Sequence, residues 1–148
     1  MKHFTIAELC RSNTATAKKI DNTPTDQVEK NLKALVENVL DPVREKLGRP
    51  IAVNCGYRSP KLNNIVGGVS NSQHVTGEAA DIESYNNLRL AKTIYELGVF
   101  DQLILEFTDA LGEPGWVHVS YSQKHNRKQV LVAKKINGKT KYTPYEFK

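Results

Sequence analysis

The chain has 148 residues, 39% of them hydrophobic, and 21 basic against 16 acidic side chains give a net charge of +5. This length predicts one domain, 1–148, whose single core buries about two thirds of the unfolded surface. No stretch approaches the ~20 apolar residues of a membrane span, and Glu8 interrupts the segment where a signal peptide would stay apolar. We therefore expect a monomer without membrane insertion that is cytoplasmic on synthesis.

The first half of the chain predicts helices. An apolar set within residues 6–10 indicates a short helix. A long helix is expected to begin with Thr23 as its N-cap and Pro24 at its first position, and to end at Gly48. Pro42 lies inside this helix and is expected to bend it, because proline removes an internal hydrogen bond.

The second half adds strands. Residues 51–55 form a strand, and a short helix starts at Ser59-Pro60 and runs to Gly67-Gly68. Another helix begins at Asn86 or Asn87 and ends before Gly98. The remaining predicted strands are 101–107, 116–121, 129–135 and 139–142, the last two flanking the hairpin signal Asn137-Gly138. The order predicts an α+β fold with N-terminal helices packed on a mainly antiparallel sheet.

Three residues have the composition of a catalytic metal site. His74, Asp81 and His118 provide two imidazoles and a carboxylate, which Zn²⁺ accepts, and three protein ligands leave a fourth position open. The stretch between His74 and Asp81 must turn back on itself, for which Gly77 can supply the backbone conformation. In the alternating segment 116–121, His118 points away from the apolar side chains.

Arg58 is the candidate for holding the substrate. It follows a strand end, where a guanidinium can form a two-pronged ion pair with a carboxylate that a lysine cannot match. Ser72 and Gln73 flank His74 and either orient it, touch substrate or form a turn.

These motifs resemble a known family. The frame SxHxxGxAxD at residues 72–81, followed by the strand Trp116-Val117-His118, is similar to the zinc D-Ala-D-Ala carboxypeptidase family, in a fold group with lysostaphin-type endopeptidases and the hedgehog domain. With the segments GYRS at 56–59 and VGG at 66–68, residues 4–135 look like its single-domain, often phage-encoded branch. The resemblance implies zinc at His74, Asp81 and His118, and substrate binding by Arg58.

The general base departs from the family pattern. Relatives place an acidic residue or a histidine two or three positions before the last ligand, where this chain has Trp116 and Gly115. If strands 101–107 and 116–121 pair with their apolar faces together, Glu106 lies on the same side as His118 and becomes the predicted base. Glu113 is the second candidate.

The resemblance implies hydrolysis of amide bonds in peptidoglycan stem peptides, by a D-Ala-D-Ala carboxypeptidase or an L,D-endopeptidase. Without a leader of its own, such an enzyme would reach the cell wall as a phage or prophage lysin. Because the usual base position is lost, a catalytically inactive zinc-containing module that binds wall peptides or a protein partner is the alternative. A structural role in a phage particle, without stoichiometric zinc, also stays open.

Two further features allow other interpretations. Cys10 and Cys55 could suggest thiol catalysis, but both fit apolar packing positions, and their spacing leaves a disulfide open. The basic residues concentrate toward the C-terminus and favour anionic surfaces in general, including wall polymers, or serve solubility. With one Trp, four Phe and no recognised motif, we expect no nucleic-acid partner.

Overall fold

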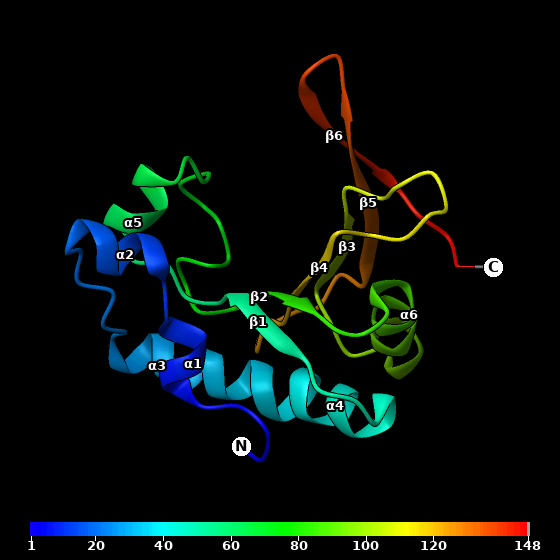
Figure 1. Ribbon diagram of the computed structural model, residues 1–148. Coiled ribbons are helices and arrows are strands. Elements are labelled where there is room, and N and C mark those ends of the chain that lie inside the picture. Colours follow the sequence, from blue (N-terminus) through cyan, green and yellow to red (C-terminus); the bar gives the residue numbers. More distant parts are fainter. Residues whose placement is uncertain (148) are drawn as a thin grey trace.

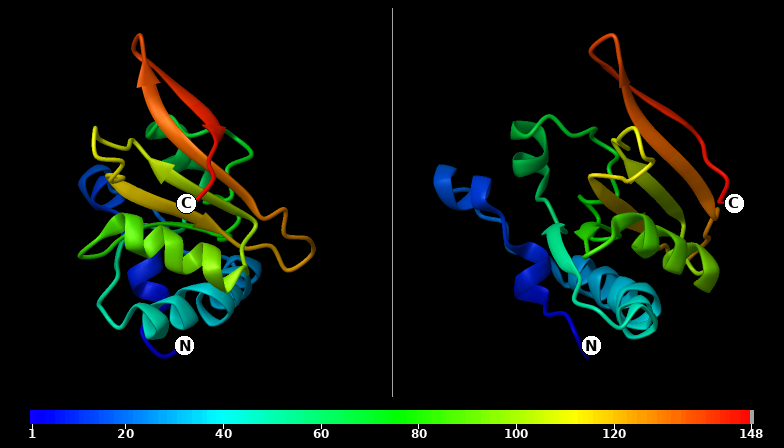
Figure 2. Two further views of the ribbon diagram at one scale, coloured as in Figure 1. Left: turned by 90° about the vertical axis from the view of Figure 1, so that its right-hand side faces the viewer. Right: turned by 45° about the vertical axis from the view of Figure 1, so that its right-hand side comes forward.

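The computed structural model describes residues 1–147, in which six strands form one sheet with helices against it (Figures 1 and 2). The helical elements are α1 (Ile6–Cys10), α2 (Asn13–Lys18), α3 (Asp26–Leu35), the π-helical turn η1 (Val36–Leu40), α4 (Asp41–Leu47), α5 (Pro60–Ile65) and α6 (Asn87–Leu97). The strands are β1 (Ala52–Cys55), β2 (Ala79–Glu83), β3 (Gln102–Glu106), β4 (Trp116–Ser120), β5 (Gln129–Ile136) and β6 (Lys139–Pro144). The predicted α+β class is confirmed.

The sheet has the strand order β1-β2-β4-β3-β5-β6. All neighbouring strands are antiparallel except β3 and β5, which run parallel. The sheet is thus mainly antiparallel, as predicted, and β5 and β6 form the predicted hairpin around Asn137-Gly138. In Figures 1 and 2 this β5–β6 ribbon extends beyond the rest of the sheet.

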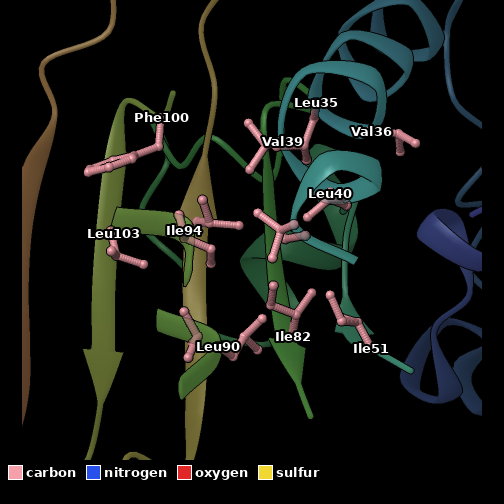
Figure 3. Close-up of a cluster of buried hydrophobic side chains, with 14 of the residues drawn as sticks. Leu35, Val36, Val39, Leu40, Ile51, Ile82, Leu90, Ile94, Phe100 and Leu103 are labelled. Carbon is pink, nitrogen blue, oxygen red and sulfur yellow. The ribbon is translucent and has the colours of Figure 1, made fainter. Parts of the chain in front are cut away.

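Strand alternation divides the sheet into two faces. Apolar side chains of one face pack against the long helix and α6, and Figure 3 shows Leu35, Val39 and Leu40 of the helix beside Ile82 of β2. The core-facing strand residues are Ala80, Ile82, Leu103, Leu105, Val117, Val119 and Val132. The residues between them in sequence therefore lie on the opposite face, which is left to carry polar groups.

The long helix is one continuous unit with two differences from prediction. Thr25, and not Thr23, is its N-cap, because the Thr25 side chain accepts a hydrogen bond from the Val28 backbone. Pro42 follows the π-helical turn η1, whose wider ring joins the Asp41 N–H to the Val36 carbonyl and accommodates the missing donor of the proline.

The other predicted caps are confirmed. Ser59 caps α5 and Asn86 caps α6, each through its side-chain oxygen. Gly48 and Gly98 end their helices in the left-handed conformation. No helix within residues 1–147 combines the length and apolar character needed to cross a bilayer.

Gly77 has the backbone that the turn before β2 requires. Its φ is +76°, and a Cβ at this position would lie 2.8 Å from the Val28 carbonyl oxygen and 2.9 Å from a Val28 methyl. The turn therefore packs directly against α3, which fixes where β2 begins.

We predict that Gly77→Ala lowers the free energy of unfolding by about 3 kcal/mol, because it combines an unfavourable φ with a backbone clash. Gly112→Ala is the matched control: its φ is +81°, yet nothing lies within 4 Å of a Cβ there. It should cost about 1 kcal/mol. Urea unfolding of both variants in chelator measures the difference, and equal losses would contradict the contact with α3.

Candidate metal centre and groove

Asp81 and His118 are held together by strand pairing. Asp81 of β2 lies directly opposite His118 of β4, on the face away from the core. The Nδ1 atom of His118 is 3.0 Å from Oδ1 of Asp81. The backbone register thus brings two of the three predicted ligands together although they are 37 residues apart in sequence.

His74 reaches the same place from the loop before β2. Its imidazole is 4% exposed, and its Nδ1 lies 2.7 Å from the Gly56 carbonyl oxygen. A carbonyl can only accept, so Nδ1 carries a hydrogen, and Nε2 is the nitrogen that becomes free to bind a metal once it is deprotonated. Nε2 lies 3.4 Å from Oδ1 of Asp81, so this nitrogen faces the other two residues.

The distances from Asp81 to the two imidazoles suit a bound zinc ion. Ligand atoms about 2.1 Å from a tetrahedral zinc lie roughly 3.4 Å from one another, and the separations here are 3.4 Å for His74 to Asp81 and 3.0 Å for His118 to Asp81. The Gly56 carbonyl provides the outer hydrogen bond that commonly orients a metal-binding imidazole. Asp81 thus lies between the two imidazoles, whose ring centroids are 5.2 Å apart.

Cys55 lies nearer to these residues than the sequence indicated. Its Sγ, a His74 ring nitrogen and an Asp81 oxygen all lie within 4.8 Å of one another. The sulfur, however, is 3.8 Å from Nδ1 of His74, which is the nitrogen engaged by Gly56. We therefore place Cys55 behind the imidazole and not among the ligands. Both cysteines are free thiols.

In the metal-free protein, His74 and Asp81 shift each other's pKa. Burial opposes protonation of His74, but its contacts with Asp81 and Cys55 raise the imidazole pKa to about 10. Burial likewise opposes ionisation of Asp81, but hydrogen bonds with His118 and His74 hold its carboxyl pKa well below the usual range. In the metal-free protein, His74 therefore carries a proton on the side that faces Asp81, where a metal cation would otherwise bind.

Glu106 lies beside the group, on the same face of the sheet. In the antiparallel register of β3 and β4 it pairs with Trp116, two residues before His118, so the predicted strand pairing and face are confirmed. Glu106 is 8% exposed. Burial and the charge of Asp81 raise its pKa to about 7, while His74 acts in the opposite direction.

Arg58 lines the same groove. Its backbone N–H donates to the His74 carbonyl at 3.0 Å, and its Nη2 lies 3.4 Å from Oγ of Ser72. The Nε atom is buried and has no hydrogen-bond partner among the described residues. Ser72 also accepts from the His74 N–H, so it links the guanidinium to the loop.

The other polar candidates have structural roles. Glu113 accepts hydrogen bonds from the backbone N–H groups of Asn87 and Leu88, where it stabilises the start of α6. Glu113, the alternative base, is thus engaged at the start of α6 and is not among the residues that line the groove with His118. Gln73 donates to Asp101, which also binds Arg127, so Gln73 tethers the loop.

The site lies in a groove of about 740 Å³. The loop after α5 forms one side with Val69, and the β5–β6 ribbon forms the other with Leu131 and Tyr142; in Figure 1 these two segments stand on opposite sides of β2. Sequence reasoning missed Tyr142. The β5–β6 ribbon that carries it joins the site through the parallel pairing of β5 with β3, which alternation alone does not reveal.

The chain is similar to known peptidases. The sequence model of a family described as peptidase M15 matches residues 2–120. The zinc D-Ala-D-Ala carboxypeptidase of Streptomyces albus G is 50% identical over 44 residues, which are 29% of this chain and 17% of that protein. The L-Ala D-Glu endopeptidase ChiX of Serratia marcescens is 18% identical, with a TM-score of 0.38 over 67% of this chain and 89% of that one.

The buried carboxyl of Glu106 predicts a pH-dependent stability in the metal-free protein. The pKa of Glu106 is about 7 in the folded protein and 4.5 ordinarily, so folding favours the protonated carboxyl. The free energy of unfolding that this carboxyl contributes is fully present below pH 4.5 and is lost as the pH rises through 7. Glu106→Gln should therefore be more stable than the wild type at pH 8.5, by about 2 kcal/mol after solvent screening, and equally stable near pH 4.5.

Urea unfolding in chelator at the two pH values measures this difference. Glu96→Gln, on the exposed surface of α6, is the control and should follow the wild type at both. A Glu106→Gln variant that shows no gain at pH 8.5 would contradict the desolvated state of this carboxyl.

Proposed function

The chain belongs to the peptidase M15 family, and we propose that it hydrolyses amide bonds in peptidoglycan stem peptides at the His74–Asp81–His118 group. Family membership confirms the resemblance and the expected class of enzyme, a zinc metallopeptidase. The proposal concerns the residues that act and the bond that is cut. Its main support is Glu106, a buried carboxyl on the same face of the sheet as His118.

His74, Asp81 and His118 would hold the zinc through Nε2, a carboxylate oxygen and Nδ1, respectively. Bound there, zinc supplies a lowered pKa for water and polarisation of the scissile carbonyl. Cys55 is left out of the proposed ligand set because its sulfur lies next to Nδ1, the His74 nitrogen engaged by Gly56. Three protein ligands would leave a fourth zinc position open. The Gly56 carbonyl keeps the His74 ring in the required tautomer.

Glu106 moves the proton. As water attacks the carbonyl carbon, the Glu106 carboxylate accepts the water proton, and when the C–N bond breaks it gives this proton to the leaving amine. A pKa of about 7 in the metal-free protein suits both directions of transfer near neutral pH. A positive charge on the neighbouring group favours the carboxylate form that starts the cycle.

Arg58 binds a carboxylate or carbonyl of the substrate. Arg58 lines the groove, and its Nη2 makes only a long contact of 3.4 Å with Oγ of Ser72, so the guanidinium retains donors for a substrate group. Two parallel N–H groups match a carboxylate in plane and spacing. The terminal carboxylate of a stem peptide is such a group.

Stem peptides are the substrate class that these features support. The relatives named above act on D-Ala-D-Ala and L-Ala-D-Glu bonds by their descriptions, and D-Ala-D-Ala carboxypeptidase or L,D-endopeptidase activity is proposed for this chain on that basis. The net charge of +5 suits an anionic cell wall. We further propose a phage or prophage lysin that acts, as a monomer, after release from the cytoplasm.

We predict that the zinc-loaded protein digests purified peptidoglycan and that Glu106→Gln lowers kcat by at least about 100-fold while zinc content is unchanged. Mass spectrometry of the products distinguishes D-alanine release from cleavage within the stem. Glu113→Gln is the matched control and should retain kcat. Zinc-loaded wild type that binds stem peptide without any turnover would instead identify a binding module.

For Arg58, we predict that Arg58→Lys raises KM at least tenfold for a pentapeptide with a free terminal carboxylate, because a lysine cannot form the two-pronged pair. Amidation of that carboxylate should raise the wild-type KM similarly and remove the difference between the two proteins. Steady-state kinetics on both peptides test this. An Arg58→Lys penalty that persists on the amidated peptide would contradict recognition of the carboxylate.

A further inference from the structure

Tyr142 lies in the groove on a segment that the family match does not reach. It belongs to β6, whereas the peptidase M15 match ends at residue 120. Its side chain is 55% exposed and lines the same groove as Arg58 and His118.

Strand pairing aligns Tyr142 with the proposed base. Glu106 pairs with Trp116 on one side and with Ala133 on the other, and Ala133 pairs with Tyr142. Directly paired residues share a face, so these four side chains form one row across the sheet. The row places an aromatic ring on each side of Glu106.

The row leaves space between Glu106 and Tyr142. Two strand spacings separate them by about 10 Å, and only the methyl group of Ala133 projects between. Partial burial and the charges of Glu106 and Asp81 raise the pKa of the Tyr142 phenol, which agrees with a ring directed toward the site.

Arg58 and Tyr142 stand at opposite ends of the groove. Arg58 follows the edge strand β1, whereas Tyr142 lies on β6, the other edge of the sheet. From β1 to β6 there are five strand spacings, about 24 Å. The side chains of Arg58 and Tyr142 both line the groove and shorten the gap that a bound extended peptide must bridge.

The end of β6 is fixed. Phe147 stacks on Tyr145 and on Tyr95 of α6, with ring centroids 4.9 and 4.8 Å apart, and the Tyr145 N–H donates to the Val130 carbonyl. The ribbon is thereby attached to the body of the protein just after Tyr142. Because the β5–β6 ribbon is already ordered, it can contact a ligand without an entropic cost of ordering.

We propose that Tyr142 is a substrate-binding residue, whose ring contacts the part of the stem peptide on the other side of the scissile bond from the group bound by Arg58. This inference rests on the proposed function and deepens it. It assigns substrate recognition to the β5–β6 ribbon, outside the residues that match the family.

Binding is tested without turnover in zinc-loaded Glu106→Gln, by titration calorimetry with the pentapeptide L-Ala-γ-D-Glu-L-Lys-D-Ala-D-Ala. Adding Tyr142→Thr, which preserves strand propensity, should raise Kd about tenfold. Adding Tyr142→Phe should change Kd less than threefold, because the ring remains. Thr143→Ala, on the opposite face of the same strand, is the matched control and should leave Kd unchanged.

Kinetics separate binding from chemistry. In the otherwise native enzyme, Tyr142→Thr should raise KM about tenfold with kcat within threefold, at unchanged zinc content. If Tyr142→Thr binds and turns over peptide as Thr143→Ala does, the inference is wrong while the proposed function stands. If wild type does not cleave and the Glu106→Gln parent does not bind the peptide, both fail together.

Discussion

The pairing of Asp81 with His118 across β2 and β4 is the constraint on which the rest of this structure depends. Because strand side chains alternate, one register both buries Ile82 and Val117 against the helices and turns Asp81 and His118 outward. A slip by one residue would exchange the two sets. The hydrophobic core therefore determines where Asp81 and His118 lie. No further interaction is needed to align the two strands that carry these proposed metal ligands.

His74 adds a second constraint from outside the sheet. Gly77, with its positive φ and its close approach to α3, returns the chain to β2, and the Gly56 carbonyl fixes the imidazole that the loop carries. Buried charges of one sign are costly unless they are compensated. In the metal-free protein, protonated His74 compensates the buried Asp81 carboxylate. A bound cation would take over this role as the proton leaves.

Much of this could be predicted from the sequence because local patterns decided it. Alternation in the segments 101–107 and 116–121 was enough to place Glu106 beside His118, since only one register buries both apolar faces. Glycine and asparagine signals likewise marked Gly48, Gly98 and the hairpin at Asn137-Gly138. These features depend on backbone preferences that a few neighbouring residues determine.

What could not be predicted depends on contacts between distant segments. Thr23 and Thr25 are both plausible caps, and only the folded chain shows that Thr25 is used. Glu113 was the second candidate base, and only the folded chain shows it at the start of α6. Cys55 and Tyr142 approach the site because β1 pairs with β2 and β5 pairs with β3, and no local pattern identifies these partners.

The central claim is that His74, Asp81 and His118 bind zinc and that Cys55 does not. Zinc K-edge X-ray absorption of the loaded protein tests it most directly. We predict nitrogen and oxygen scatterers at about 2.0–2.1 Å and no sulfur, with the same spectrum for Cys55→Ala. A sulfur scatterer near 2.3 Å that disappears in Cys55→Ala would contradict this assignment.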